Sequence, residues 1–183
     1  TLSLKAGDLN RVDAETLRPA LSADVFVVFG ASYIKGWLIE FLVNNNAINI
    51  HMGLSPYYRG SSCNFWAMFD NNPGYVGATI HKLSTGLDSG DMLFHCLSRP
   101  QHGENCFQFT MRSVVIAHRA LASRISSGEL FQMVAVKQDS NKEIRYTKNS
   151  DFSDSVAQKF LEQRLVMEDC DLDYPDLLNP FFG

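Results

Sequence analysis

The chain has 183 residues, of which 45% are hydrophobic and 20% charged, a composition typical of one globular domain with a sizeable core. Its net charge of −4 offers no basic footprint for nucleic acid, and no apolar run is long enough to cross a bilayer. We therefore expect that this chain alone binds no nucleic acid and no membrane.

The cysteines indicate a compartment rather than a metal site. Cys63, Cys96, Cys106 and Cys170 form no CxxC pair and lack zinc-type spacing with a histidine. Scattered reduced thiols are typical of a cytoplasmic protein. We expect a cytoplasmic location and no metal.

The first half of the chain predicts an α/β fold. Residues 25–29 are a continuous apolar run ending at Gly30, a pattern typical of a strand buried on both faces. A short helix is predicted at residues 35–42, and residues 47–51 read as the next buried strand. A strand, a helix and a strand within about thirty residues form a βαβ unit.

The second half alternates strands with two longer helices. Residues 104–127 form the longest predicted helix, with Phe107, Met111 and Val115 among the apolar residues at helical spacing and Gly128 at the C-cap. The other predictions are strands at 76–83, 91–97 and 130–136 and a helix at 153–165. We expect one domain over residues 1–167. Residues 168–183, acidic and aromatic, are expected to be a tail that docks on the body or on a partner.

Three polar side chains are candidates for chemistry. Asn49 and His51 are two apart on an extended segment, so their side chains point the same way. Asp88 stands between Gly86 and Gly90, which permit close backbone approach to a ligand. An amide and an imidazole can hold an oxyanion while a carboxylate manages protons, which suits acyl transfer to an amine.

Each candidate also has a structural interpretation. Asn49 is equally explained as a loop cap, His51 as a satisfied buried histidine, and Asp88 as a solvated turn residue. His81 either supports the site or belongs to the core.

Taken together, the motifs resemble those of the folate-dependent formyltransferases. These include glycinamide ribonucleotide transformylase, methionyl-tRNA formyltransferase and, closest in wording, the sugar N-formyltransferases. The resemblance covers roughly residues 24–110. Its motifs are Asn49-Ile50-His51, the Leu-x-Pro-x-Tyr-Arg-Gly element at residues 54–60, Thr79-Ile80-His81 and Asp88-Ser89-Gly90.

The resemblance implies roles and a fold. It implies a Rossmann-like, mostly parallel sheet with flanking helices, and it matches Asn49, His51 and Asp88 to the catalytic Asn, His and Asp. The formyl donor is 10-formyltetrahydrofolate, held largely by the backbone of two loops. These loops match Ser32, Tyr33, Ile34 and Lys35 after the first strand, and Leu83, Thr85, Gly86 and Leu87 before Asp88.

The chain departs from the family pattern at two places. Met52-Gly53 replaces the usual small residue and serine after the histidine, and Leu54-Ser55-Pro56 replaces Leu-Leu-Pro. Only about two dozen residues precede the strand at 25–29, and Thr1 is not an initiator Met. We therefore expect the fold to lack its N-terminal portion. The sheet edge left uncovered would favour a homodimer or a longer native chain.

The resemblance implies transfer of a formyl group from 10-formyltetrahydrofolate to an amine of a small substrate, such as an amino sugar nucleotide. Two alternatives stay open. Water replaces the amine in a formyltetrahydrofolate hydrolase, and an inactive binding or assembly module would keep the folate pocket without turnover.

Overall fold

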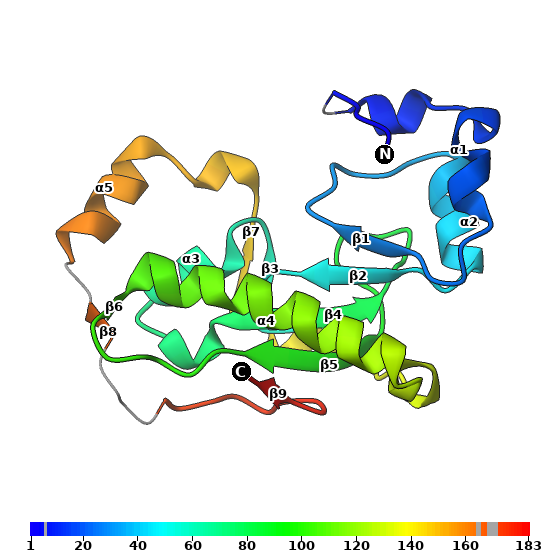
Figure 1. The fold of residues 1–183 in the computed structure, drawn as a ribbon. Helices are drawn as coiled ribbons and strands as arrows, with labels where there is room; N and C mark the ends of the chain where they lie inside the picture. The colour runs from blue at the N-terminus through cyan, green and yellow to red at the C-terminus, as the bar shows by residue number, and fades with distance from the viewer. Residues whose placement is uncertain (6, 164–165, 168–171) are drawn as a thin grey trace.

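The computed structural model describes residues 1–183 except 6, 164–165 and 168–171. Its main element is a five-stranded sheet in the order β1-β2-β4-β5-β9 (Figure 1). Strand β1 is parallel to β2, β5 is parallel to β9, and β4 is antiparallel to both of its neighbours. Four of the five strands therefore run the same way, which confirms the mostly parallel α/β sheet. The strands are β1 (Val27–Phe29), β2 (Ile48–His51), β4 (Gly77–Lys82), β5 (Met92–Leu97) and β9 (Phe181–Phe182).

Helices flank this sheet, and two short strand pairs lie outside it. Helix α4 (Cys106–Ser126) crosses β4 and β5, while α1 (Ala14–Leu21) and α2 (Trp37–Asn44) lie beside β1, away from α3 (Cys63–Phe69) and α5 (Asp154–Glu162) (Figure 1). The short pairs are β3 (Tyr58–Gly60) with β7 (Arg145–Thr147) and β6 (Glu104–Asn105) with β8 (Val166–Met167). The 3-10 helices are η1 (Asp8–Arg11), η2 (Pro73–Tyr75), η3 (Glu129–Gln132), η4 (Ser140–Lys142) and η5 (Asn149–Asp151).

Helix α4 is fixed at both ends by local chemistry. The Asn105 side chain accepts from the Gln108 backbone N–H, and the Gln108 side chain accepts in return from the Asn105 N–H, a capping box. At the other end Gly128 adopts φ +77°, which glycine tolerates without steric cost. The predicted helix at 104–127 is thus confirmed apart from its terminal residues.

The face of α4 that packs on the sheet is not the face that carries the predicted apolar stripe of Phe107, Met111 and Val115. Phe109, Ile116 and Ala120 are buried, whereas Phe107 is 72% exposed and Met111 and Val115 are each 46% exposed. The inner face thus combines one large ring with smaller side chains, among them Ala117 and Ala120, which let the helix axis approach the sheet closely. Phe107 and Met111 of the outer stripe line a cavity described below.

Two predicted elements need correction. The strand predicted at 130–136 is wrong: the chain turns at Gly128 into η3, and only Val136 forms an isolated bridge, to Met92. The helix predicted at 153–165 begins after Ser153, whose side chain accepts from the Val156 N–H, and its assigned span ends at Glu162. Residues 164–165 of that prediction, and residues 168–171 of the predicted tail, lie outside the described residues.

Candidate active site

The three predicted catalytic side chains converge. Asn49 lies inside β2 and His51 ends it, and both face the Asp88 carboxylate. Asn49 Nδ2 donates to Asp88 Oδ1 at 3.1 Å, and His51 Nδ1 lies 3.4 Å from Asp88 Oδ2. One carboxylate therefore holds both an amide and an imidazole.

Asp88 reaches these residues because the loop after β4 folds back across β2. The Leu83 N–H donates to the Ala47 carbonyl, which fixes the start of the loop beside the start of β2. Asp88 itself adopts φ +46°, a left-handed conformation uncommon for a residue other than glycine. The Gln138 side chain secures this turn, since its Nε2 donates to the carbonyls of Asp88 and Gly90, each at 2.8 Å.

His81 is a fourth member of the cluster. Its Nδ1 lies 2.8 Å from the Lys82 carbonyl, which can only accept, so Nδ1 carries the proton. That leaves Nε2 to accept from Asn49 Nδ2 at 3.0 Å, and Nε2 is also 3.8 Å from Asp88 Oδ1. His81 thus lies beside Asn49 and Asp88, the position that a supporting residue of the site would take.

The charges of Asp88 and His51 stabilise each other. Burial alone would raise the pKa of the Asp88 carboxyl, but the hydrogen bond from His51 and the charge of that ring outweigh it and hold the pKa well below its usual range. Burial alone would lower the pKa of His51, but Asp88 and the Cys63 thiol more than offset it and raise the pKa to about 10. This environment therefore favours the imidazolium form of His51.

The hydrogen bonds of His51 agree with a doubly protonated ring. Nδ1 faces the Asp88 carboxylate, and Nε2 lies 3.3 Å from the Tyr58 carbonyl; both partners are acceptors. Cys63 Sγ also lies 3.5 Å from Nε2. This close packing depends on Gly53, because a Cβ there would stand 2.5 Å from Cys63 Cβ and 2.8 Å from His51 Nε2.

The two loops predicted to hold the donor also meet. They line a small cavity of about 70 Å³ together with Asn49, His81 and Asp88. The Tyr33 hydroxyl donates to the Thr85 carbonyl at 2.9 Å and ties one loop to the other. Lys35 and Thr85 are not among the residues that line this cavity; the lining residues from the predicted set are Ser32, Tyr33, Ile34, Leu83, Gly86 and Leu87.

A larger cavity lies on the other side of His51. It has a volume of about 550 Å³ and is lined by His51 and Cys63 and by side chains of α3, α4 and α5. We call it the lateral cavity. His51 thus lines the larger space, beneath α5, and Asp88 lines the smaller one, beside the predicted donor loops.

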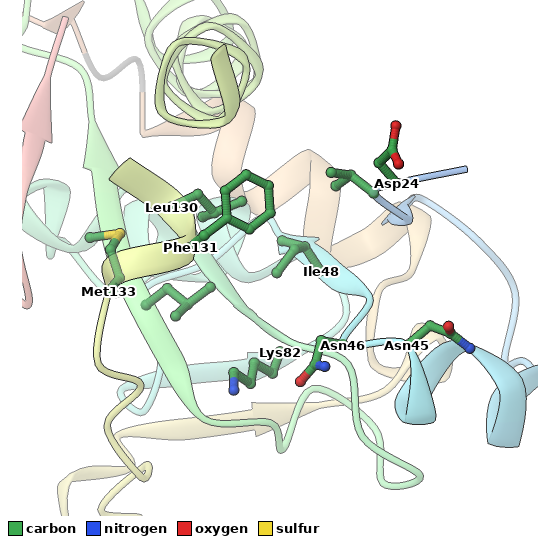
Figure 2. Close-up of a pocket in the computed structure, with 10 residues that line it drawn as sticks. Asp24, Asn45, Asn46, Ile48, Lys82, Leu130, Phe131 and Met133 are labelled. Atoms are coloured by element: carbon green, nitrogen blue, oxygen red, sulfur yellow. The ribbon is translucent and has the colours of Figure 1, made fainter. Parts of the chain in front are cut away.

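Another cavity, of about 380 Å³, contains none of the predicted site residues. Figure 2 shows Asp24, Ile48, Lys82 and Phe131 among the side chains that line it. It offers no link to the Asn49–His51–Asp88 cluster.

Within the described residues, no group of three or more His, Cys, Asp or Glu side chains could hold a metal ion. None of the described helices is long and apolar enough to span a membrane.

Three residues of this site were missed in the sequence: Cys63, Gln138 and Gly53. Cys63 contacts His51, and Gln138 contacts the Asp88 turn, from segments that are distant in sequence. No local sequence pattern predicts either contact. The replacement of serine by Gly53 was the one available signal, because a glycine in place of a larger residue indicates close approach by a neighbour.

Comparisons with known proteins show the family and the fold. The family described as formyl transferase matches residues 8–125. The methionyl-tRNA formyltransferase of Anaeromyxobacter dehalogenans is 30% identical over 120 residues, which cover 66% of this chain and 38% of that protein. The mitochondrial formyltetrahydrofolate deformylase 2 of Arabidopsis thaliana is 28% identical over 130 residues, covering 68% and 38%.

Among solved structures, the formyltransferase PseJ of Anoxybacillus kamchatkensis superimposes with a TM-score of 0.60 at 21% identity. The match covers 88% of this chain and 75% of that one, and that structure holds a formamido sugar nucleotide and tetrahydrofolate. The likeness shows a shared fold. The chain spans about two fifths of the length of the two curated relatives above.

Proposed function

Because the chain belongs to the formyl transferase family, we propose that it transfers a formyl group from 10-formyltetrahydrofolate to an amine of a small substrate. The observation that carries the proposal is the cluster of Asn49, His51 and Asp88, joined at 3.1 and 3.4 Å beside the cavity between the two loops.

The chemistry of the cluster suits this reaction. The amine nitrogen bonds to the formyl carbon, the bond from that carbon to the donor nitrogen breaks, and a proton passes from the amine to the leaving nitrogen. His51 and Asn49 donate to the formyl oxygen while it carries negative charge, and Asn49 exchanges its bond to His81 for this one. Asp88 keeps His51 charged and oriented and assists removal of the amine proton. An imidazolium and an amide in a buried site stabilise an oxyanion more strongly than water does.

The two loops fit a folate ring system in chemistry. Val28, Ile39 and Leu87 give the cavity apolar sides, and a folate ring edge would bind to backbone groups of the two loops. We assign the donor to residues Ser32–Lys35 and Leu83–Leu87. Since the cavity is only about 70 Å³, we expect the loops to separate on binding and the bond from Tyr33 to Thr85 to break.

The acceptor is an amine of a small molecule. An amino sugar nucleotide belongs among the amines to be tested, because the sequence motifs are closest to those of sugar N-formyltransferases.

A second candidate is hydrolysis of the donor, which the likeness to a formyltetrahydrofolate deformylase favours. Water would then take the place of the amine at the same cluster, and formate would be the product.

One assay separates these functions. The chain is incubated with 10-formyltetrahydrofolate, with and without a panel of amines, and tetrahydrofolate, formate and N-formyl products are measured. We expect tetrahydrofolate and an N-formyl amine to appear together. Formate without an amine would support the hydrolase, whereas binding of 5-formyltetrahydrofolate without any turnover would indicate a binding module.

A further inference from the structure

The lateral cavity is large and carries almost no charge. Its volume of about 550 Å³ is that of a typical small-molecule site. Among the described residues that line it, none is Asp, Glu, Lys or Arg, and His51 is the single charged group. Its chemistry therefore differs from that of a phosphate site, which needs cations or converging N–H groups.

Aromatic side chains make the wall opposite His51. The Phe65 ring on α3 packs edge-on against Phe152 and Phe160, with centroids 4.8 and 5.0 Å away. At the rim, Phe107 on α4 and Leu161 on α5 are 72% and 73% exposed. The wall is ordered by its own contacts while the rim leaves large apolar area in water.

The polar groups of the lateral cavity are few and mostly engaged. Asn64 Oδ1 accepts from the Gly77 N–H at 3.0 Å, and Thr110 Oγ1 donates to the Phe107 carbonyl at 3.0 Å. A phosphate or diphosphate moved into this space would lose its hydration without gaining partners, which is strongly unfavourable. An apolar body would gain from the same surroundings.

The position of this cavity links it to the transfer step. His51 lines it, and the carboxylate that holds His51 lines the cavity between the donor loops. An amine that enters from the lateral cavity thus meets the cluster at His51. A space with no carboxylate also favours the neutral amine, which is the nucleophilic form.

We propose that the lateral cavity binds the acceptor and that this acceptor is a primary amine on an uncharged aliphatic or aromatic body, without phosphate inside the cavity. The inference rests on the proposed function and narrows its substrate class.

The test is a series of linear alkylamines from methylamine to hexylamine, compared with phosphoethanolamine and an amino sugar nucleotide. Each methylene that enters the cavity raises kcat/KM about threefold to fourfold. A flat or falling series, or preference for a phosphate-bearing amine, overturns the inference while formyl transfer itself stands.

Leu161→Asp supplies the matching variant, because the side chain is exposed and its charge would face the cavity rim. We expect it to lower kcat/KM for hexylamine at least tenfold and to leave methylamine unchanged. Val134→Asp, at a residue 80% exposed and outside this cavity, is the control. Equal losses in both variants, or none in either, count against the site.

Binding gives a readout that does not need turnover. Calorimetry should detect N-formylhexylamine binding more tightly than N-formylmethylamine, and Leu161→Asp should weaken only the former. If the folded protein does not bind N-formylhexylamine, the inference about the lateral cavity is overturned, whether or not any amine is formylated. A failure of the turnover assay would count against the proposed function instead.

Discussion

At the scale of single residues, the site is organised around one carboxylate. Asp88 accepts from Asn49 and pairs with His51, and its pKa lies well below its usual range. Such a carboxylate is a weak base, so its main contribution is to keep His51 charged and oriented. Cys63 and the Tyr58 carbonyl occupy the other nitrogen of His51, and in the proposed reaction a formyl oxygen competes with them for that N–H.

The pH dependence of His51 gives the first prediction. Its pKa of about 10 lies above the unfolded value of 6.5, so its contribution to stability is complete below pH 6.5 and is lost as pH rises towards 10. The pH profile of activity should show a high-pH limb, a fall in rate over the same range. Cys63→Ala removes one group that raises this pKa, and the limb should move to lower pH.

A titration of the His51 ring by NMR, together with the pH profile of kcat, measures this shift. Cys106→Ala is the control, because Cys106 lines the same cavity without being among the groups that raise the pKa of His51. An unmoved profile in Cys63→Ala would show that the thiol has no influence on His51.

At the scale of elements, the site depends on segments that are distant in sequence. Gln138 secures the turn at Asp88, and the edge strand β9 comes from the last residues of the chain. His95 on β5 joins two such segments: its Nε2 donates to the Ser55 carbonyl at 2.9 Å, and its Nδ1 accepts from the Leu178 N–H at 3.0 Å.

Gln138→Ala should slow formyl transfer roughly tenfold to a hundredfold, because two hydrogen bonds worth about 1 kcal/mol each no longer hold the Asp88 turn. We expect kcat to fall with little change in KM for the amine, since the acceptor cavity is not touched. Gln132→Ala, at an exposed residue, is the control. A change in KM alone would contradict the positioning role.

His95 predicts a loss of stability on acidification. Burial lowers its pKa to about 4, although the bond to Ser55 opposes this, so between pH 6.5 and 4 the unfolded chain binds a proton that the folded chain does not. Stability therefore falls as pH drops through that window, by roughly 3 kcal/mol in all. Urea unfolding at several pH values measures the slope, and His95→Asn should flatten it. An identical slope in the variant would assign the acid sensitivity to other groups.

The sequence predicted the elements whose patterns are local. The strands at 25–29, 47–51, 76–83 and 91–97 all correspond to strands of the sheet within a few residues. Pairings between remote segments, such as β3 with β7, carry no local signal. Helical spacing likewise does not tell which of two apolar stripes on α4 meets the sheet.

The same contrast holds for the site. Asn49 and His51 were recognisable from a two-residue spacing on one strand, but their contact with Asp88 depends on how the loop after β4 folds back. Cys63 reaches His51 only because Gly53 leaves room; the glycine signals a close approach in the sequence, but only the structure identifies the neighbour.

At the scale of the whole molecule, we propose that residues 1–167 form the catalytic domain and that residues 168–183 are its tail. The described part of that tail adds β9 to the sheet beside β5. At the opposite edge, β2 is the one partner of β1 among the strands that the structure describes, and Val27 and Phe29 are 46% and 43% exposed.

An edge strand with exposed apolar side chains favours pairing with another strand. We expect the chain to form a homodimer through β1 at micromolar concentrations, and Val27→Lys to shift it towards the monomer. Sedimentation velocity measures both states, with Val134→Lys as the control. A monomer at all concentrations would contradict this expectation.

The central claim is that Asp88, with His51 and Asn49, carries formyl transfer. The most direct measurement is the rate of N-formyl amine formation by Asp88→Asn, which keeps the size of the side chain and removes its charge, against Asp91→Asn at an exposed position nearby. We predict a fall of roughly 10²–10⁴-fold for Asp88→Asn with 5-formyltetrahydrofolate still bound, and no change for Asp91→Asn. A folded Asp88→Asn variant with the wild-type rate would contradict the account.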